Sequence, residues 1–188
     1  MTPLSRAFLA VHPPTEVVEA VDARLRAVPP VDGLRWMPRD QWHITLRFCG
    51  RVPDADGLVD AVAAVGAASA PIPGVVLDGA GAFPKARHGS ALWLGVVGEA
   101  AAGALGALAA AVEGACRDAG LAPDDRVFLP HVTVARCARA RDLRPVIAAV
   151  GQAVPGPAWT VDHVRLMASD TRPTGAVHTE VARIPLSG

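Results

Sequence analysis

The most informative feature of this chain is a pair of short segments with the same residue pattern, one in each half. They are HITL at 43–46 and HVTV at 131–134, and each reads His, apolar, Thr, apolar. Successive side chains of a β-strand point to opposite faces, so the His and Thr of each string share one face. The apolar residues share the other face. The pattern therefore predicts two half-buried strands that each present His and Thr away from a core.

The other histidines do not share this pattern. His12, His88, His163 and His178 are followed by Pro, Gly, Val and Thr. Random placement at this composition would give about 0.07 such strings per chain, so two matches favour a shared function over coincidence. We expect the remaining four histidines to lie at the surface or to be satisfied by hydrogen bonds.

Hydrophobic periodicity and Pro/Gly breakers divide the chain into strands and helices that repeat around the two strings. The two halves each contain a His strand followed by a short connection and an amphipathic helix. The pattern predicts an α+β fold in a single bilobal domain over 1–188, with two pseudo-symmetric lobes. Each lobe is expected to be an antiparallel sheet with helices packed outside, and the active-site cleft is expected between them. Strands are predicted at 6–11, 34–37, 42–48, 75–82, 91–97, 131–137, 159–167 and 177–184, and helices at 17–28, 53–65, 99–119 and 143–150.

Charge and cysteine content narrow the function classes. With 18 basic and 18 acidic residues the formal net charge is zero, which argues against broad electrostatic capture of long nucleic acid. Cys49, Cys116 and Cys137 are odd in number and have no CxxC spacing, so neither a disulfide framework nor a zinc site is indicated. The apolar run 100–112 is too short to span a bilayer, and no signal-peptide pattern is present. We therefore expect a soluble cytoplasmic protein with no membrane association.

The paired histidines suit acid–base chemistry on a phosphodiester. Histidine titrates near pH 6.5, so one of a pair can be neutral while the other is protonated. One then activates water and the other protonates the departing oxygen, while Thr45 and Thr133 donate to the phosphate oxygens. The residues alone do not say whether His43 or His131 is the acid. HExxH, GxSxG and P-loop motifs are missing, and we expect no metal and no cofactor.

Two arginines and two aromatic residues flank the strings. Arg136 is a candidate phosphate ligand, although strict alternation puts it on the face opposite His131, so this role requires a strand end or a bulge. Alternation places Arg47 on the same face as His43, where it is either a ligand or a solvated arginine. Trp42 and Phe128 are able to stack on a base, but packing is the more ordinary role for both.

Further segments, in collinear order along nearly the whole chain, carry a resemblance to a known family. With these segments the chain resembles the two-histidine (HxTx) phosphoesterases, and within them the bacterial and archaeal RNA 2′,3′-cyclic phosphodiesterases, historically called 2′-5′ RNA ligases. The segments are RAFLAVHPP at 6–14, RWMPRDQWHITLRFCG at 35–50, GAFP at 81–84, LWLGV at 92–96, FLPHVTVAR at 128–136 and ARIPL at 182–186.

The resemblance implies a bilobal fold and metal-independent opening of a ribose 2′,3′-cyclic phosphate to a 2′-phosphate. It implies that His43 donates a proton to the 3′ oxygen and that His131 acts as base for water. Thr45 and Thr133 would contact the phosphate, and Arg136 would help to bind substrate. Met167 and His178 depart from the aromatic residues common at these positions, which bears on base preference.

Three functions remain open at this point. The first is hydrolysis of RNA 3′ ends or small cyclic nucleotides by a monomeric enzyme. The second is 2′-5′ ligation of tRNA halves, which runs the same site backwards. The third is a module that binds RNA ends without turnover, and the neutral charge argues against its tight binding of long RNA.

Overall fold

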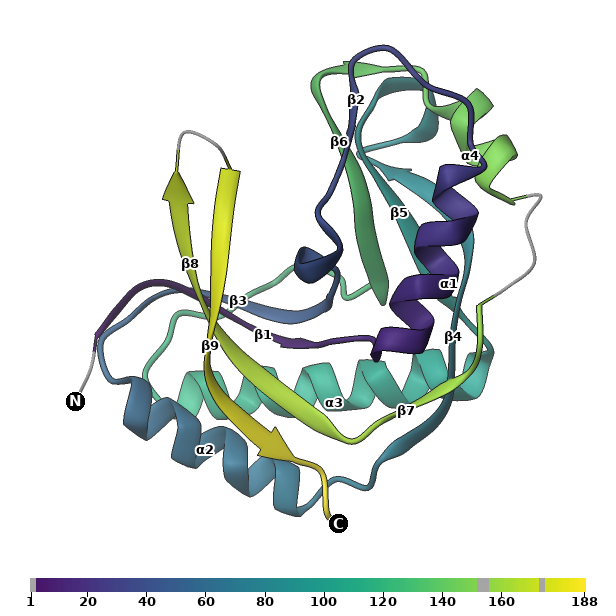
Figure 1. Cartoon of the computed structure of the whole chain (residues 1–188). Helices are drawn as coiled ribbons and strands as arrows, with labels where there is room; N and C mark the ends of the chain where they lie inside the picture. Colours follow the sequence, from purple (N-terminus) through teal and green to yellow (C-terminus); the bar gives the residue numbers. More distant parts are fainter. Residues whose placement is uncertain (1–2, 152–155, 173–174) are drawn as a thin grey trace.

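A curled antiparallel sheet forms the body of the protein, with helices on its outer side (Figure 1). The computed structural model describes residues 3–151, 156–172 and 175–188, and nine strands of these residues form the sheet. One half of the sheet contains β1 (Leu4–Val11), β3 (Ile44–Val52), β8 (His163–Arg172) and β9 (Gly175–Pro185). The other half contains β2 (Leu34–Trp36), β4 (Ile72–Phe83), β5 (Gly89–Val97), β6 (His131–Arg141) and β7 (Trp159–Val161).

The order of the strands shows how the two halves meet. It runs β7-β4-β5-β6-β3-β1-β8-β9, and β2 pairs with β6 beside this path. The two His strands, β3 and β6, are therefore neighbours at the middle of the sheet. They share one paired position, Ile44 opposite Val132, and then diverge. The predicted α+β fold with two lobes is confirmed, and the joint between the lobes is the pair of His strands.

The lobes do not correspond to the two halves of the sequence. The chain leaves the β1 half to form β2, returns for β3, and crosses again to form β4 to β7. One strand was expected at 159–167, but this segment is divided at Asp162. β7 pairs with β4 in one half and β8 pairs with β1 in the other. The single-strand prediction was wrong because periodicity records which side chains are buried and does not record which neighbour supplies the hydrogen bonds.

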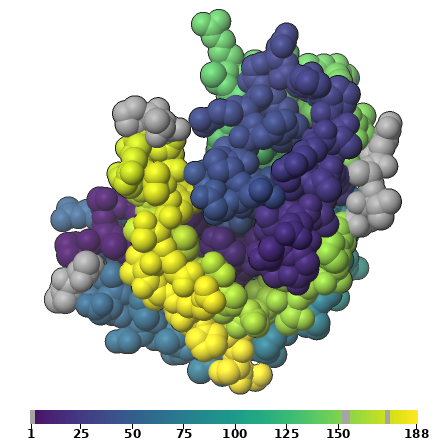
Figure 2. All heavy atoms as spheres, in the orientation of Figure 1, coloured from purple at the N-terminus to yellow at the C-terminus, as the bar shows by residue number. Residues whose placement is uncertain are grey.

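In the described part of the chain, four helices cover the outer face of the sheet: α1 (Thr15–Arg26), α2 (Ala55–Ala67), α3 (Glu99–Asp118) and α4 (Arg144–Gly151). The carboxylate of Asp54 accepts from Gly57 N–H and caps α2, which explains the start of that helix. α3 contacts strands of both halves, namely β3, β4 and β5. The helices therefore leave the inner face of the sheet uncovered. Figure 2 shows that the molecule is hollowed between the yellow β8–β9 hairpin and the blue segment that contains β2.

Helix α3 is long and apolar enough by length and composition to cross a membrane, which the shorter run at 100–112 did not indicate. Its apolar stripe is nevertheless used inside the domain. Leu105, Leu108, Val112 and Cys116 are buried in the main core, together with residues from both halves of the sheet. This packing is that of the core helix of a globular domain.

Candidate active site

His43 and His131 are held by the same local device. His43 Nδ1 donates to the carbonyl oxygen of Gln41 over 2.7 Å, and His131 Nδ1 donates to that of Leu129 over 2.6 Å. A carbonyl oxygen only accepts, so each neutral ring must carry its proton on Nδ1. The Nε2 atom of each ring is then left to take or give a proton. Both rings are half-buried.

The strand register brings the two motifs together. Ile44 and Val132 are fully buried and face each other, so the antiparallel register opposes His43 to Thr133 and Thr45 to His131. Both threonines are half-buried on the face opposite the core. Burial lowers the pKa of His43, and electrostatic interactions with His178, His131 and Arg136 lower it further, as expected for groups of one site. The two predicted motifs therefore converge.

A bulge in β6 brings Arg136 to the same face as His131. The register against β5 shifts between Leu92 and Trp93, so Val134 and Ala135 are both buried and the alternation is reversed after them. Arg136 is exposed, and its charge adds to burial in lowering the pKa of both motif histidines. The bulge that the ligand role of Arg136 required is thus present.

A second bulge, in β3, has the opposite consequence for Arg47. The register against β1 shifts between Leu9 and Ala10, which turns Arg47 toward the core and Phe48 toward the site face. The Arg47 side chain is only 4% exposed, pairs with Glu113, and donates to backbone carbonyls of Phe48 and Ala122. The prediction that Arg47 shares a face with His43 was wrong, because alternation assumes an unbulged strand.

His43 lies in a cluster of rings. Phe8 stacks on it with centroids 4.7 Å apart, and His178 and His12 lie at 5.4 and 5.5 Å. Burial is the main cause that lowers the pKa of His43 to about 4, although its bond to Gln41 opposes the shift. Burial also lowers the pKa of His12 to about 3 and lowers that of His178. In the free protein these rings are neutral at pH 7.

His131 has aromatic neighbours instead. Phe83 meets its ring edge-on at 4.9 Å, and Trp93 lies at 6.0 Å. Burial lowers the pKa of His131 below its usual value, and the hydrogen bond to Leu129 opposes this. Both motif histidines are therefore neutral at pH 7 with an Nε2 lone pair. Arg136 supplies a permanent positive charge to the site.

Sequence reasoning missed most of these surroundings. It assigned no site role to His12, it considered His178 only for base preference, and it did not single out Phe8, Phe83 or Trp93, although RAFL, GAFP and LWLGV contain them. Met167 is buried against Phe8 and Ala10 in a small cluster separate from the main core. Trp42 is 3% exposed in the core and Phe128 packs against it, so the packing interpretation holds for both.

The donor set offers little to a metal ion. Across residues 3–151, 156–172 and 175–188, no group of three His, Cys, Asp or Glu side chains is placed to hold one. Cys49, Cys116 and Cys137 are free and buried. What the described residues do provide is two anchored imidazoles, two threonines and one arginine on the inner face of the sheet. This set suits acid–base chemistry at an anionic centre.

A family model described as the 2′-5′ RNA ligase superfamily matches residues 8–173, and the chain belongs to this superfamily. The matched range includes both HxTx strings and Arg136.

Two curated relatives share part of this chain. An RNA 2′,3′-cyclic phosphodiesterase of Geobacillus stearothermophilus is 41% identical over 103 residues, which are 54% of this chain and 32% of the relative. An RNA 2′,3′-cyclic phosphodiesterase of Aeropyrum pernix is 35% identical over 112 residues, which are 57% of this chain and 60% of the relative. The chain therefore spans less than two thirds of the length of either relative.

Solved structures have the same fold over nearly the whole chain. TT0787 of Thermus thermophilus has a TM-score of 0.73 at 27% identity, covering 97% of this chain and 98% of its own. E. coli LigT in its apo form has a TM-score of 0.74 at 23% identity and full coverage of both chains. E. coli LigT has also been solved with 3′-AMP and with NADP+.

Proposed function

We propose that this protein hydrolyses ribose 2′,3′-cyclic phosphates, at RNA 3′ ends or in small cyclic nucleotides, to 2′-phosphates without a metal ion. The observation that carries the proposal is the matched anchoring of His43 and His131 on neighbouring strands, with Nε2 of each available. The names of the curated relatives and the nucleotides bound by E. coli LigT support the same substrate class. We also propose that the protein is a cytoplasmic monomer; its free, buried cysteines fit the reducing compartment.

In the proposed reaction the two histidines act on opposite sides of phosphorus. Nε2 of His131 takes a proton from water as the water oxygen bonds to phosphorus. The bond from phosphorus to O3′ breaks, and O3′ receives a proton from Nε2 of His43. Thr45, Thr133 and Arg136 hold the remaining phosphate oxygens as charge develops. The product carries its phosphate on O2′.

The assignment of acid and base rests on the family resemblance, and it places a requirement on His43. Its pKa of about 4 leaves the free ring neutral at pH 7, whereas a general acid must be protonated. A bound phosphate supplies the missing charge, because an anion within a few ångströms favours the protonated ring and acts more strongly where water is excluded. Substrate binding is thus expected to be accompanied by proton uptake at His43.

The test is product analysis on a short RNA that ends in a 2′,3′-cyclic phosphate, in EDTA. We expect turnover to a 2′-phosphate end, read by mass and by resistance to an enzyme that removes only 3′-phosphates. A 3′-phosphate product would mean that O2′ and not O3′ is the leaving oxygen, which would overturn the proposed roles. Loss of turnover in EDTA, or binding with no product at high protein concentration, would overturn the proposal itself. Paired tRNA halves with the matching ends test for the reverse 2′-5′ ligation.

A further inference from the structure

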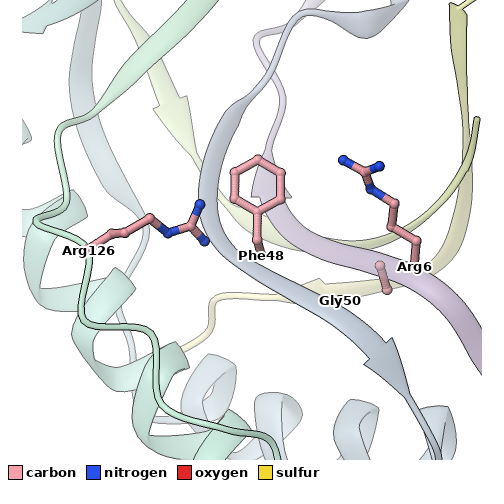
Figure 3. Close-up of a pocket in the computed structure, with 5 residues that line it drawn as sticks. Arg6, Phe48, Gly50 and Arg126 are labelled. Carbon is pink, nitrogen blue, oxygen red and sulfur yellow. The ribbon is translucent and has the colours of Figure 1, made fainter. Parts of the chain in front are cut away.

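A shallow pocket of about 310 Å³ lies beside the candidate active site along β1 and β3. Arg6, Phe48 and Arg126 line it, together with Ala7 and Gly50. In Figure 3 the Phe48 ring stands between the two guanidinium groups, with Arg6 coming from β1 and Arg126 from the segment before β6. None of these side chains takes part in the acid–base chemistry described above.

The Phe48 ring is available to a ligand. The bulge in β3 turns it to the same face as Thr45 and leaves it 44% exposed. Its ring lies 6.1 Å from that of Phe8, which in turn stacks on His43. Phe8 is only 2% exposed and has no free face for a base. Phe48 is therefore the exposed ring that follows His43 along this side of the site.

Arg6 brings a positive charge to this edge of a neutral protein, and Arg126 brings a second guanidinium whose charge is balanced by Asp124. The guanidinium of Arg126 lies 4.8 Å from the centre of the Phe48 ring and is held there by a two-point contact with Asp124. Arg6 donates from Nη1 to Thr171 Oγ1 over 3.5 Å, and its charge adds to burial in lowering the pKa of His178. An exposed ring beside two guanidinium groups matches what single-stranded nucleic acid offers, a base to stack and a phosphate to pair.

The direction of the reaction decides which part of the substrate reaches this pocket. In an in-line displacement the water and the departing O3′ lie on opposite sides of phosphorus. Water is on the side of His131, so the ribose that carries O3′ is on the side of His43. The RNA strand leaves that ribose through its 5′ oxygen and continues over the β1–β3 half of the site. That half is where Phe48, Arg6 and Arg126 lie.

We propose that this pocket binds the penultimate nucleotide of an RNA strand that ends in a cyclic phosphate. Its base stacks on Phe48, and the phosphate that links it to the terminal ribose pairs with Arg6 and Arg126. This inference rests on the proposed function and extends it, because it makes an oligonucleotide a better substrate than a cyclic mononucleotide.

The experiment compares a 2′,3′-cyclic mononucleotide with a dinucleotide that ends in the same nucleotide and cyclic phosphate. The quantity of interest is the ratio of the two kcat/KM values, dinucleotide over mononucleotide. In Phe48→Leu and in Arg6→Ala we expect this ratio to fall roughly tenfold, since stacking on one aromatic ring and one phosphate contact each have effects of that size. In Arg6→Ala the salt dependence of dinucleotide KM also weakens.

Arg144→Ala is a control for the loss of an arginine outside the pocket. Arg144 makes the same two-residue fork to Asp142 that Arg126 makes to Asp124, but it begins α4, away from the pocket. Its ratio should match that of the unaltered protein. Circular dichroism of each variant checks folding, and the mononucleotide rate serves as an internal check of the catalytic centre.

Three other results would contradict the proposed subsite. An equal fall for both substrates would make Phe48 a contact of the terminal base, and an unchanged ratio in both variants would leave the pocket without a nucleotide. An unaltered protein that prefers the mononucleotide would also overturn it. Failure of the unaltered protein to hydrolyse either substrate is a different result, because it refutes the proposed function and not only the subsite.

Discussion

The two His strands, β3 and β6, follow one plan but present a different side chain to the site after their bulges. His131 begins β6 and His43 immediately precedes β3; each ring is anchored to the carbonyl two residues before it, and each His is followed by a Thr and then by a bulge. Six residues after each His stands a buried cysteine, Cys49 or Cys137. Five residues after each His the bulge turns one side chain to the site, which is Phe48 in β3 and Arg136 in β6.

The two strands thus share the residues that suit the chemistry, and they differ in the residues that suit substrate recognition. The repeated part supplies two equivalent imidazoles, which a symmetric attack on phosphorus can use from both sides. Arg136 adds a charge for the phosphate on one side, while Phe48 adds an exposed ring on the other. The surroundings diverge as well, with neighbouring histidines around His43 and aromatic rings around His131. The symmetric residues thus suit the reaction, and the asymmetric ones suit a substrate with two unlike ends.

Removing either of the two equivalent imidazoles should have the largest effect on activity. In His43→Ala and in His131→Ala we expect kcat on a cyclic mononucleotide to fall about 10²- to 10⁴-fold, the usual contribution of a general acid or base. His88→Ala is a control, because His88 is an exposed residue of the short 3-10 helix between β4 and β5 and has neither motif's pattern. Full activity in either motif variant would contradict the acid–base pair.

Arg47 precedes Phe48 but is turned into the core and not toward the site, so we expect its replacement to change stability. Arg47→Met removes the buried partner of Glu113, and we expect the free energy of unfolding to fall by about 3 kcal/mol. Denaturant unfolding measures this, with Arg51→Met, an exposed arginine of the same strand, expected to change it by less than about 0.5 kcal/mol. A loss of activity without a loss of stability would instead place Arg47 in the site.

The asymmetry at the fifth position predicts a smaller effect for Arg136. In Arg136→Gln we expect kcat/KM on a cyclic mononucleotide to fall about 10- to 100-fold, since hydrogen bonds to charged groups contribute roughly 1.5–3 kcal/mol. Beyond the effect of burial, the positive charge of Arg136 lowers the pKa of both motif histidines, so its removal should also move both limbs of the pH profile to higher pH. A pH profile that does not shift in Arg136→Gln would show that the charge of Arg136 does not act on the two rings.

The pH profile sharpens the comparison of His43 with His131 in the unaltered protein. Both pKa values lie below 6.5 in the free protein, because burial disfavours the charged ring. The productive form has His43 protonated, so above both pKa values kcat/KM should fall about tenfold for each pH unit. The alkaline limb of kcat should lie at higher pH, since the bound phosphate raises the pKa of His43. A kcat/KM that is flat between about pH 6 and 8 would contradict this.

Much of the site could be predicted because its signal is local. The His and Thr of each string share a face as a direct result of strand geometry, whereas the bonds from Nδ1 to carbonyls two residues away became visible only in the structure. What could not be predicted depends on neighbours far along the chain. Each bulge is a mismatch between paired strands, so nothing in 43–48 alone shows that Arg47 turns inward. Phe8, His12 and His178 reach His43 only because β1 pairs with β3, and β8 and β9 follow β1 in the curled sheet.

The sequence by itself determined the two histidines, their threonines, the order of strands and helices apart from the division at Asp162, and the family to which the chain belongs. These follow from side-chain periodicity and from motifs a few residues long. The tertiary structure decided that both strings meet at one joint of the sheet, that Arg136 faces them while Arg47 does not, and that Phe48 stands exposed beside them. Strand register is set by pairing across the whole sheet, and a shift of one residue moves a side chain to the other face.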